Sequence, residues 1–132
     1  MDYIVLHELA LPAEWFVPIA ERCAISGVSV ISGIDYLVTE KNKYCINPVW
    51  MSLVSEKDGG FRQTVYVCEN KKDFSYEEEN EVATLGFGND PYKTNKNHAI
   101  IRHGDFCFST LICSELTDIE NRTRLRGLVD AL

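Results

Sequence analysis

Cys113 is the residue of this sequence whose position most suggests chemistry. It ends the apolar run in the stretch FCFSTLICSE, residues 106–115, and a polar segment of helical composition follows it. A thiol at a turn from a strand into a helix is exposed, and the N–H groups at the helix start favour a thiolate and could hold an oxyanion. Free cysteine is also among the most buried residue types, and Cys107 lies in the same run. Position alone therefore favours a buried thiol over a nucleophile.

Two further ionisable groups could serve such a thiol. Glu8 closes an apolar run in HELALP, and a carboxylate near a thiol can act as the base that acyl transfer requires. Lys71 and Lys72 end another strand-like segment, and either could supply an amine. Taken alone, the glutamates at 77–79 favour a solvated loop. Glu8, Lys71 and Cys113 each end a separate predicted strand, where open α/β sheets place their sites.

Five segments carry a resemblance to a known family. In chain order they are HELALP, YCINPVWM, KKDFSYEE, STLICSE and LRGLVDAL. Together they resemble the nitrilase, or carbon-nitrogen hydrolase, superfamily, in which a Glu, a Lys and a Cys occur in this order and an Asn precedes the turn before the Lys. The resemblance implies hydrolysis of amides or nitriles, with Glu8 as base, Cys113 as nucleophile and Lys71 as the group that stabilises the tetrahedral intermediate. A nearby ammonium also offsets the cost of holding a carboxylate base in a closed pocket.

The resemblance covers nearly the whole chain but only about the middle of the family's domain. It implies that residues 1–132 form a partial α-β-β-α sandwich with mixed sheets, without the family's first strand and helix and its C-terminal half. We therefore expect the segment to need more chain or another subunit for stability and activity. His7 stands where the family usually has Pro, and Ser114 replaces a common aromatic residue, which removes a pocket wall.

A non-catalytic role is the alternative interpretation. Nitrilase-like domains also occur attached to other domains, including bacterial reverse transcriptases of the defence type, and the segments ICSELTDI and LRGLVDAL resemble that branch. In such a protein the domain would serve assembly or sensing.

The apolar patterns predict one α/β domain. A strand at 3–7, a helix that Pro12 begins and that stops at 25–27, and a strand at 28–37 suggest a crossover unit. The further predicted elements are strands at 44–54 and 62–68 around a turn at 56–60, a long polar connection at 69–90, a hairpin of 99–102 with 106–112, a helix at 118–126 and the start of a strand at 129–132.

Composition limits which binding partners and which cellular compartment are expected for the protein. Acidic residues outnumber basic ones by 20 to 13, for a formal net charge of −7, so neither nucleic acid nor an anionic membrane surface is expected as a partner. The start MDYIVLHELALP lacks a positively charged region, and charges interrupt any long apolar span, so secretion and membrane insertion are not expected. Five scattered cysteines without paired spacing favour reduced thiols in the cytoplasm.

No cofactor is expected for this chemistry. His98, His103 and Cys107 could be considered as metal ligands, but they have no second pair that would complete a tetrahedral site, so a metal site is not favoured. The expected partners are a small amide or nitrile substrate and either further copies of the chain or a fused domain.

Overall fold

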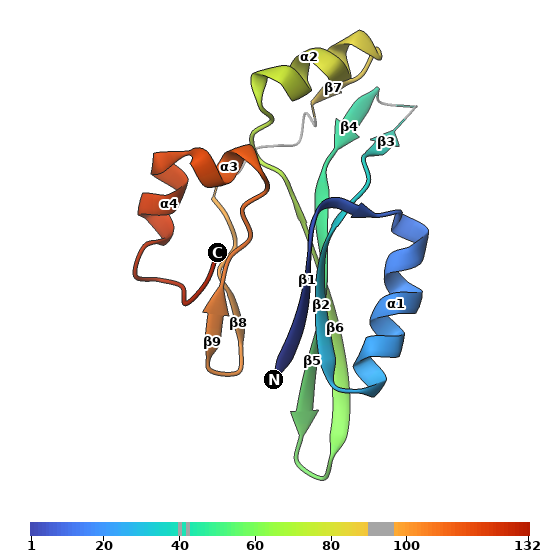
Figure 1. The fold of residues 1–132 in the computed structure, drawn as a ribbon, viewed down its shortest axis with the longest axis vertical. Helices are drawn as coiled ribbons and strands as arrows, with labels where there is room; N and C mark the ends of the chain where they lie inside the picture. Colours follow the sequence, from blue (N-terminus) through green and yellow to red (C-terminus); the bar gives the residue numbers. More distant parts are fainter. Residues whose placement is uncertain (40, 42, 90–96) are drawn as a thin grey trace.

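The computed structural model describes residues 1–39, 41, 43–89 and 97–132, and its architecture is mixed α/β, which confirms the predicted class (Figure 1). The helices are α1 (Ala13–Ile25), α2 (Tyr76–Thr84), α3 (Ser114–Thr117) and α4 (Ile119–Leu125). The strands are β1 (Asp2–Leu11), β2 (Val28–Ile34), β3 (Leu37–Thr39), β4 (Tyr44–Ile46), β5 (Pro48–Lys57), β6 (Phe61–Asn70), β7 (Gly88–Asn89), β8 (Ile101–His103) and β9 (Phe106–Phe108). Among the described residues, no helix combines the length and apolar character needed to cross a membrane.

The main sheet has the strand order β1-β2-β5-β6. β1 and β2 are parallel and joined by α1, so the predicted crossover unit is confirmed. β2 pairs antiparallel with β5, and β5 and β6 form a long hairpin around the turn predicted from EKDGG. Two smaller sheets have the strand orders β3-β4-β7 and β8-β9.

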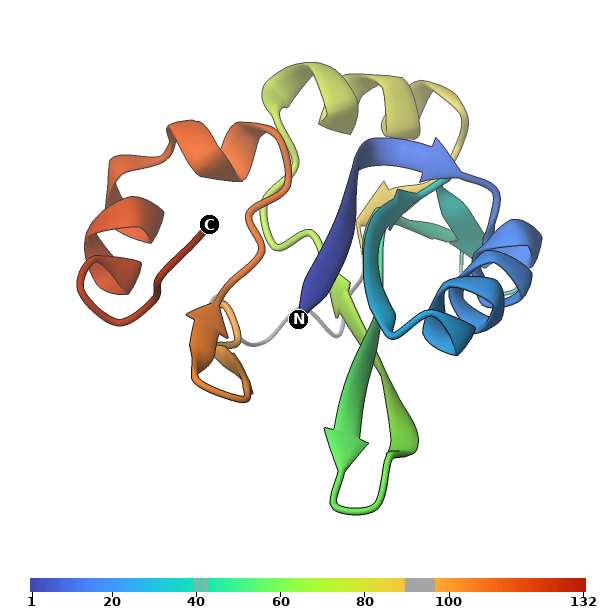
Figure 2. The ribbon, with the colours of Figure 1, turned by 60° about the horizontal axis from the view of Figure 1, so that its bottom comes forward.

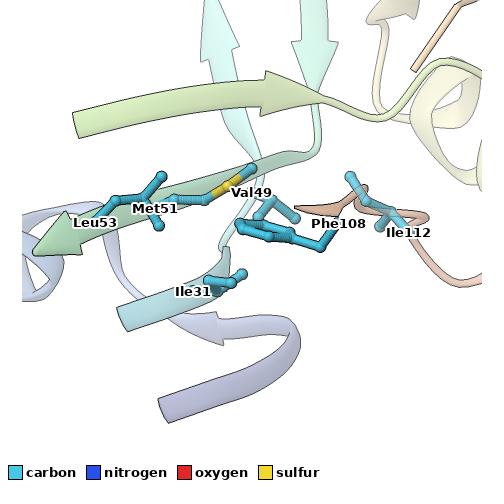
Figure 3. Close-up of a cluster of buried hydrophobic side chains, with 6 residues drawn as sticks. All are labelled: Ile31, Val49, Met51, Leu53, Phe108 and Ile112. Carbon is cyan, nitrogen blue, oxygen red and sulfur yellow. The ribbon is translucent and has the colours of Figure 1, made fainter. Parts of the chain in front are cut away.

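The main sheet is covered on both faces. On one face α1 packs Phe16 and Ala20 against Val30 and Ile34 of β2. On the other face, Ile31 of β2 begins a second cluster, because successive side chains of a strand point to opposite faces. The full second cluster is Ile31, Val49, Met51, Leu53, Phe108 and Ile112, and Figure 3 shows Phe108 and Ile112 directed at the β2 and β5 side chains.

The C-terminal region, from β8 to α4, lies across the sheet from α1. Figures 1 and 2 show α1 on one side of the main sheet, with β8, β9 and α4 on the other. Phe108 and Ile112 attach this region to the sheet through the second cluster. The α1 helix and the C-terminal region therefore lie on opposite faces of the main sheet.

Several predicted elements differ in the structure. The prediction of a long connection at 69–90 is wrong, because α2 and β7 form within it. The strand predicted at 44–54 is interrupted at Asn47, whose side chain donates to Glu8. The strand predicted at 28–37 ends at Ile34, and β3 follows as a separate strand. Of the run at 106–112 only β9 is a strand, and the residues at 129–132 contribute a single bridge from Ala131 to Phe108.

Candidate functional site

Glu8 lies where β1 departs from regular pairing with β2. The pairing is regular up to Leu6 and resumes only at Leu11, so the strand is irregular around Glu8. Leu9 has a φ of 54°, a left-handed conformation that non-glycine residues rarely adopt. Gly33 of β2 lies against this irregularity, and a Cβ at that position would be 2.5 Å from the Glu8 Cα. The irregular backbone and the missing side chain at Gly33 together position the carboxylate.

Lys71 directly follows β6, and the β5–β6 hairpin places it opposite Asn47. Its backbone N–H donates to the Asn47 carbonyl at 2.8 Å. The side chain is wholly buried, with Nζ 3.0 Å from Oε1 of Glu8 and 2.7 Å from Oε2 of Glu78. Burial alone would lower the pKa of Lys71, but hydrogen bonds to Glu78 and Glu8 outweigh it and hold the pKa above its usual value. Lys71 is therefore a buried ammonium between two carboxylates.

The two candidate lysines have different surroundings. Lys72 is only half-buried, and its backbone N–H donates to Oε1 of Glu115. Lys71 carries both contacts to carboxylate side chains, so it is the lysine that lies beside Glu8.

Glu78 belongs to the site, although the sequence placed it in a solvated loop, and that prediction is wrong for this residue. It is the third residue of α2, whose cap Ser75 accepts from the Glu78 N–H at 3.2 Å and donates its own N–H to Oε2 at 2.8 Å. Tyr36 donates its hydroxyl to Oε1 at 3.1 Å. Burial would raise the pKa of Glu78, but the Lys71 hydrogen bond and the other donors lower it. The Ser-x-x-Glu spacing of a capping box was the local signal that could have located this helix start.

Asn47 is a further residue of the site. It is buried between β4 and β5, and its Nδ2 donates to Oε1 of Glu8 at 2.5 Å. Since Lys71 donates to the same oxygen, both of these donors act on Oε1 of Glu8. Oε2 is then the oxygen of the carboxylate available to a third group.

Cys113 is exposed and precedes α3, with φ 50° and ψ −107°. The structure therefore contradicts a buried thiol at this position. A hydrogen bond with Glu8, then partial burial and the Glu8 charge, raise the pKa of the thiol, and the charge of Lys71 opposes them only in part. The Glu8 carboxylate therefore acts against the thiolate that was expected from the helix start. The residue also follows four non-strand residues rather than a strand.

Glu115 connects the segments that carry Cys113 and Lys71. This buried carboxylate accepts from the Ile112 N–H at 2.9 Å, from the Asp73 N–H at 3.2 Å and from the Lys72 N–H. Backbone donors from two distant segments therefore converge on one side chain. No local pattern indicates that Glu115 joins these two segments, because the Lys72 and Asp73 donors are more than 40 residues away.

A cavity of about 370 Å³ opens beside Glu8 and Cys113, both of which line it. A larger hollow of about 540 Å³ lies beside α4 and contains none of Glu8, Lys71 and Cys113. Lys71 lines neither cavity, and the smaller one is where a substrate of Glu8 and Cys113 would lie.

The three residues considered as metal ligands do not come together. His103 is engaged by the Tyr3 hydroxyl, 2.6 Å from Nδ1, and by Ser55 Oγ, 3.0 Å from Nε2. Within the described ranges no three His, Cys, Asp or Glu side chains are placed to hold a metal ion, so His98, His103 and Cys107 form no such set.

The arrangement unites a thiol, a carboxylate and a buried ammonium at one end of the main sheet. No family model, curated protein or solved structure matches the chain. The geometry can support nucleophilic attack by sulfur, proton transfer by Glu8 and stabilisation of negative charge by Lys71.

Proposed function

We propose that this chain carries the site of a thiol-dependent carbon-nitrogen hydrolase acting on amides or nitriles. The observation that carries the proposal is that Glu8 lies 3.0 Å from Nζ of Lys71 and lines the same cavity as Cys113. The carboxylate also raises the pKa of the Cys113 thiol. A nucleophile, a carboxylate base and a cation gathered at one site are the constellation that acyl transfer requires.

The first half of the reaction forms a thioester. With an amide, Glu8 takes the proton of the Cys113 thiol as sulfur attacks the carbonyl carbon. The carbonyl oxygen becomes negatively charged, and the Lys71 ammonium stabilises it. The carbon-nitrogen bond then breaks, and the proton held by Glu8 passes to the departing nitrogen, so that ammonia or an amine leaves.

The second half regenerates the thiol. Glu8, again ionised, takes a proton from a water molecule that attacks the thioester carbon. The carbon-sulfur bond breaks, the proton returns to sulfur, and a carboxylic acid is released. One carboxylate thus serves both halves, which requires that it remain close to sulfur throughout.

Asn47 and Glu78 hold these groups in place. Asn47 fixes Oε1 of Glu8 at 2.5 Å, which leaves the other oxygen for proton transfer. Glu78 contacts Lys71 Nζ through both oxygens, at 2.8 and 2.7 Å, and keeps the ammonium charged inside the protein. Release of one of these two contacts would free a proton of Nζ for the developing oxyanion.

The fold that we propose is part of a nitrilase-like α-β-β-α sandwich. The order of α1, the main sheet, the β8–β9 sheet and α4 supports it, as does the cluster that packs Phe108 and Ile112 between the two sheets.

The test is an acyl adduct on Cys113. We would incubate the protein with a panel of aliphatic and aromatic amides, quench with acid, and measure intact mass together with released ammonia. The proposal expects an adduct that Cys113→Ala abolishes and that Cys107→Ala, the matched control from the same segment, retains. Equal ammonia release by wild type and Cys113→Ala, with no protein adduct from any amide, would contradict the hydrolase proposal and favour a role in assembly or sensing.

A further inference from the structure

The cavity beside Cys113 and Glu8 has a predominantly apolar lining. Besides those two residues it is bordered by Ile31, Val49 and Ile112 of the second cluster and by the rings of Tyr3, Phe106 and Phe108. The three rings contact one another, with centroids 5.7 Å apart for Tyr3–Phe106 and Phe106–Phe108 and 6.1 Å apart for Tyr3–Phe108. One side of the cavity is therefore an aromatic wall that continues into the core.

We infer that this cavity binds the acyl part of an uncharged, apolar primary amide, such as a medium-chain aliphatic or an arylalkyl amide. The inference rests on the proposed function, since it gives that site its substrate class. Binding of the acyl chain here would bring the carboxamide carbon to the end of the cavity that Cys113 and Glu8 line.

Polar groups of the lining already have hydrogen-bond partners within the protein. The Tyr3 hydroxyl lies 2.6 Å from Nδ1 of His103, and the ring of His7 lies 2.6 Å from the Glu8 carbonyl. The lining residues include no Lys or Arg in the described part of the chain, so a substrate carboxylate would find no counter-charge. A charge without a partner in an apolar site is costly, which favours a neutral acyl group.

The net charge of the site also disfavours an anionic substrate. Glu8 and Glu78 contribute two negative charges against the one positive charge of Lys71, so the group carries a net −1 when all three are ionised. An anionic substrate would approach this excess negative charge.

The size of the cavity limits the acyl group. Since a cavity of about 150 Å³ holds a benzene ring, the space of about 370 Å³ accommodates one ring with a short linker or a chain of about six carbons.

Binding can be measured without the chemistry. In the Cys113→Ala variant, we would compare hexanamide with two matched probes by calorimetry: the monoamide of adipic acid, which ends in a carboxylate, and 6-aminohexanamide, which ends in an ammonium. Hexanamide should bind at least about tenfold more tightly than either charged probe, because the charged end would have to be desolvated. Equal binding of the three amides, or no binding of hexanamide, would overturn the inference.

A charge placed at the rim supplies a second measurement. Val5 borders the cavity and is 69% exposed, whereas its neighbour Ile4 is 42% exposed and does not line it. Val5→Lys should improve binding of the adipic monoamide by about tenfold, since it supplies the missing counter-charge, and the matched control Ile4→Lys should not. An equal gain in both variants would show general charge attraction and contradict the assigned cavity.

The two proposals fail separately. If Cys113→Ala binds hexanamide selectively but wild type forms no acyl adduct with any amide, the cavity assignment stands and the hydrolase proposal falls. If wild type forms adducts equally well with neutral and charged amides, the hydrolase proposal stands and the substrate class is wrong.

Discussion

The Glu8 carboxylate acts on the Cys113 thiol and forms an ion pair with Lys71. Its hydrogen bond and charge raise the pKa of the Cys113 thiol, which favours the protonated form of sulfur. Its contact with Lys71 meanwhile keeps a positive charge within 3.0 Å of the carboxylate. In the proposed reaction the thiolate forms as the proton moves to Glu8, whereas a site that lowers the pKa of its thiol would store a thiolate.

Replacing Glu8 by Gln should make Cys113 more reactive to a simple alkylating agent while abolishing the proposed hydrolysis. Glu8→Gln keeps the shape but removes the negative charge that raises the thiol pKa, so the pKa falls and more thiolate exists at pH 8. Alkylation by iodoacetamide at pH 8 should accelerate about threefold or more, and its pH midpoint should move down, whereas amide hydrolysis should drop by about 100-fold. Peptide mass spectrometry over a pH series would follow Cys113, with Cys107 as the internal control. Slower alkylation of Cys113 in the variant would contradict the assigned contact.

At the scale of the elements, the features visible in the sequence are those with local causes. The apolar run of β1, the turn-forming EKDGG and the residues around Gly27 predict the crossover and the hairpin because each depends on adjacent residues. Glu8, Lys71 and Cys113 could be placed together because they follow apolar segments. Lys71 could be separated from Lys72 only by the β5–β6 ladder, which fixes the register of the hairpin end.

The features that the sequence did not reveal depend on distant partners. α2 buries only Val82, so it has no apolar face to produce a helical period, and a capping box specifies its start. Glu115 is buried because backbone donors from another segment satisfy it, and the local pattern FCFSTLICSE contains no trace of those donors.

Gly33 should be essential to the end of β1. A Cβ at this position would meet the Glu8 Cα and the His7 carbonyl at 2.5 Å, so Gly33→Ala must move the β1 backbone. We expect a loss of about 1–3 kcal/mol in the free energy of unfolding, together with loss of Cys113 acylation. Gly88→Ala is the matched control, because it also lies in a strand and its nearest neighbour would be at 3.8 Å. Urea denaturation measures both variants, and equal effects would argue against close packing at Gly33.

His103 should make the docking of the β8–β9 hairpin sensitive to acid. It is 5% exposed and lies 2.6 Å from the Tyr3 hydroxyl. Burial and the N-terminal charge lower its pKa, against a backbone hydrogen bond with Val54 that raises it. Because the folded-state pKa is depressed, the stabilisation is present above the unfolded value near 6.5 and is lost as pH falls through the folded value.

The pH dependence of melting tests this link. Wild-type Tm should fall more steeply than that of His103→Gln as pH decreases from 7.5 to 5.5, since glutamine does not titrate. The exposed His7→Gln variant should keep the wild-type slope. Parallel curves for wild type and His103→Gln would rule out this role for the imidazole.

For the whole molecule, the position of the site depends on the core between the two sheets. Glu8 and Lys71 belong to segments of the main sheet, whereas Cys113 belongs to the C-terminal region. Phe108 and Ile112 pack the C-terminal region onto the main sheet, and Glu115 adds hydrogen bonds to the segment after Lys71. The same contacts that bury the second cluster therefore bring the nucleophile to its base.

Truncating Phe108 should accordingly weaken stability and the site together. Phe108 is 4% exposed within the second cluster, so Phe108→Ala should lower the free energy of unfolding by about 3–5 kcal/mol, a large part of the stability of a typical domain. Urea titrations would be followed by tryptophan fluorescence, which reports on Trp50 in β5 and Trp15 in α1, and by the rate of Cys113 acylation. Both transitions should shift to lower urea. Phe61→Ala is the control, because Phe61 is 70% exposed at the hairpin turn. If acylation were lost while the fluorescence transition kept its midpoint, the C-terminal region would dock independently of the sheet, and a single cooperative unit would be excluded.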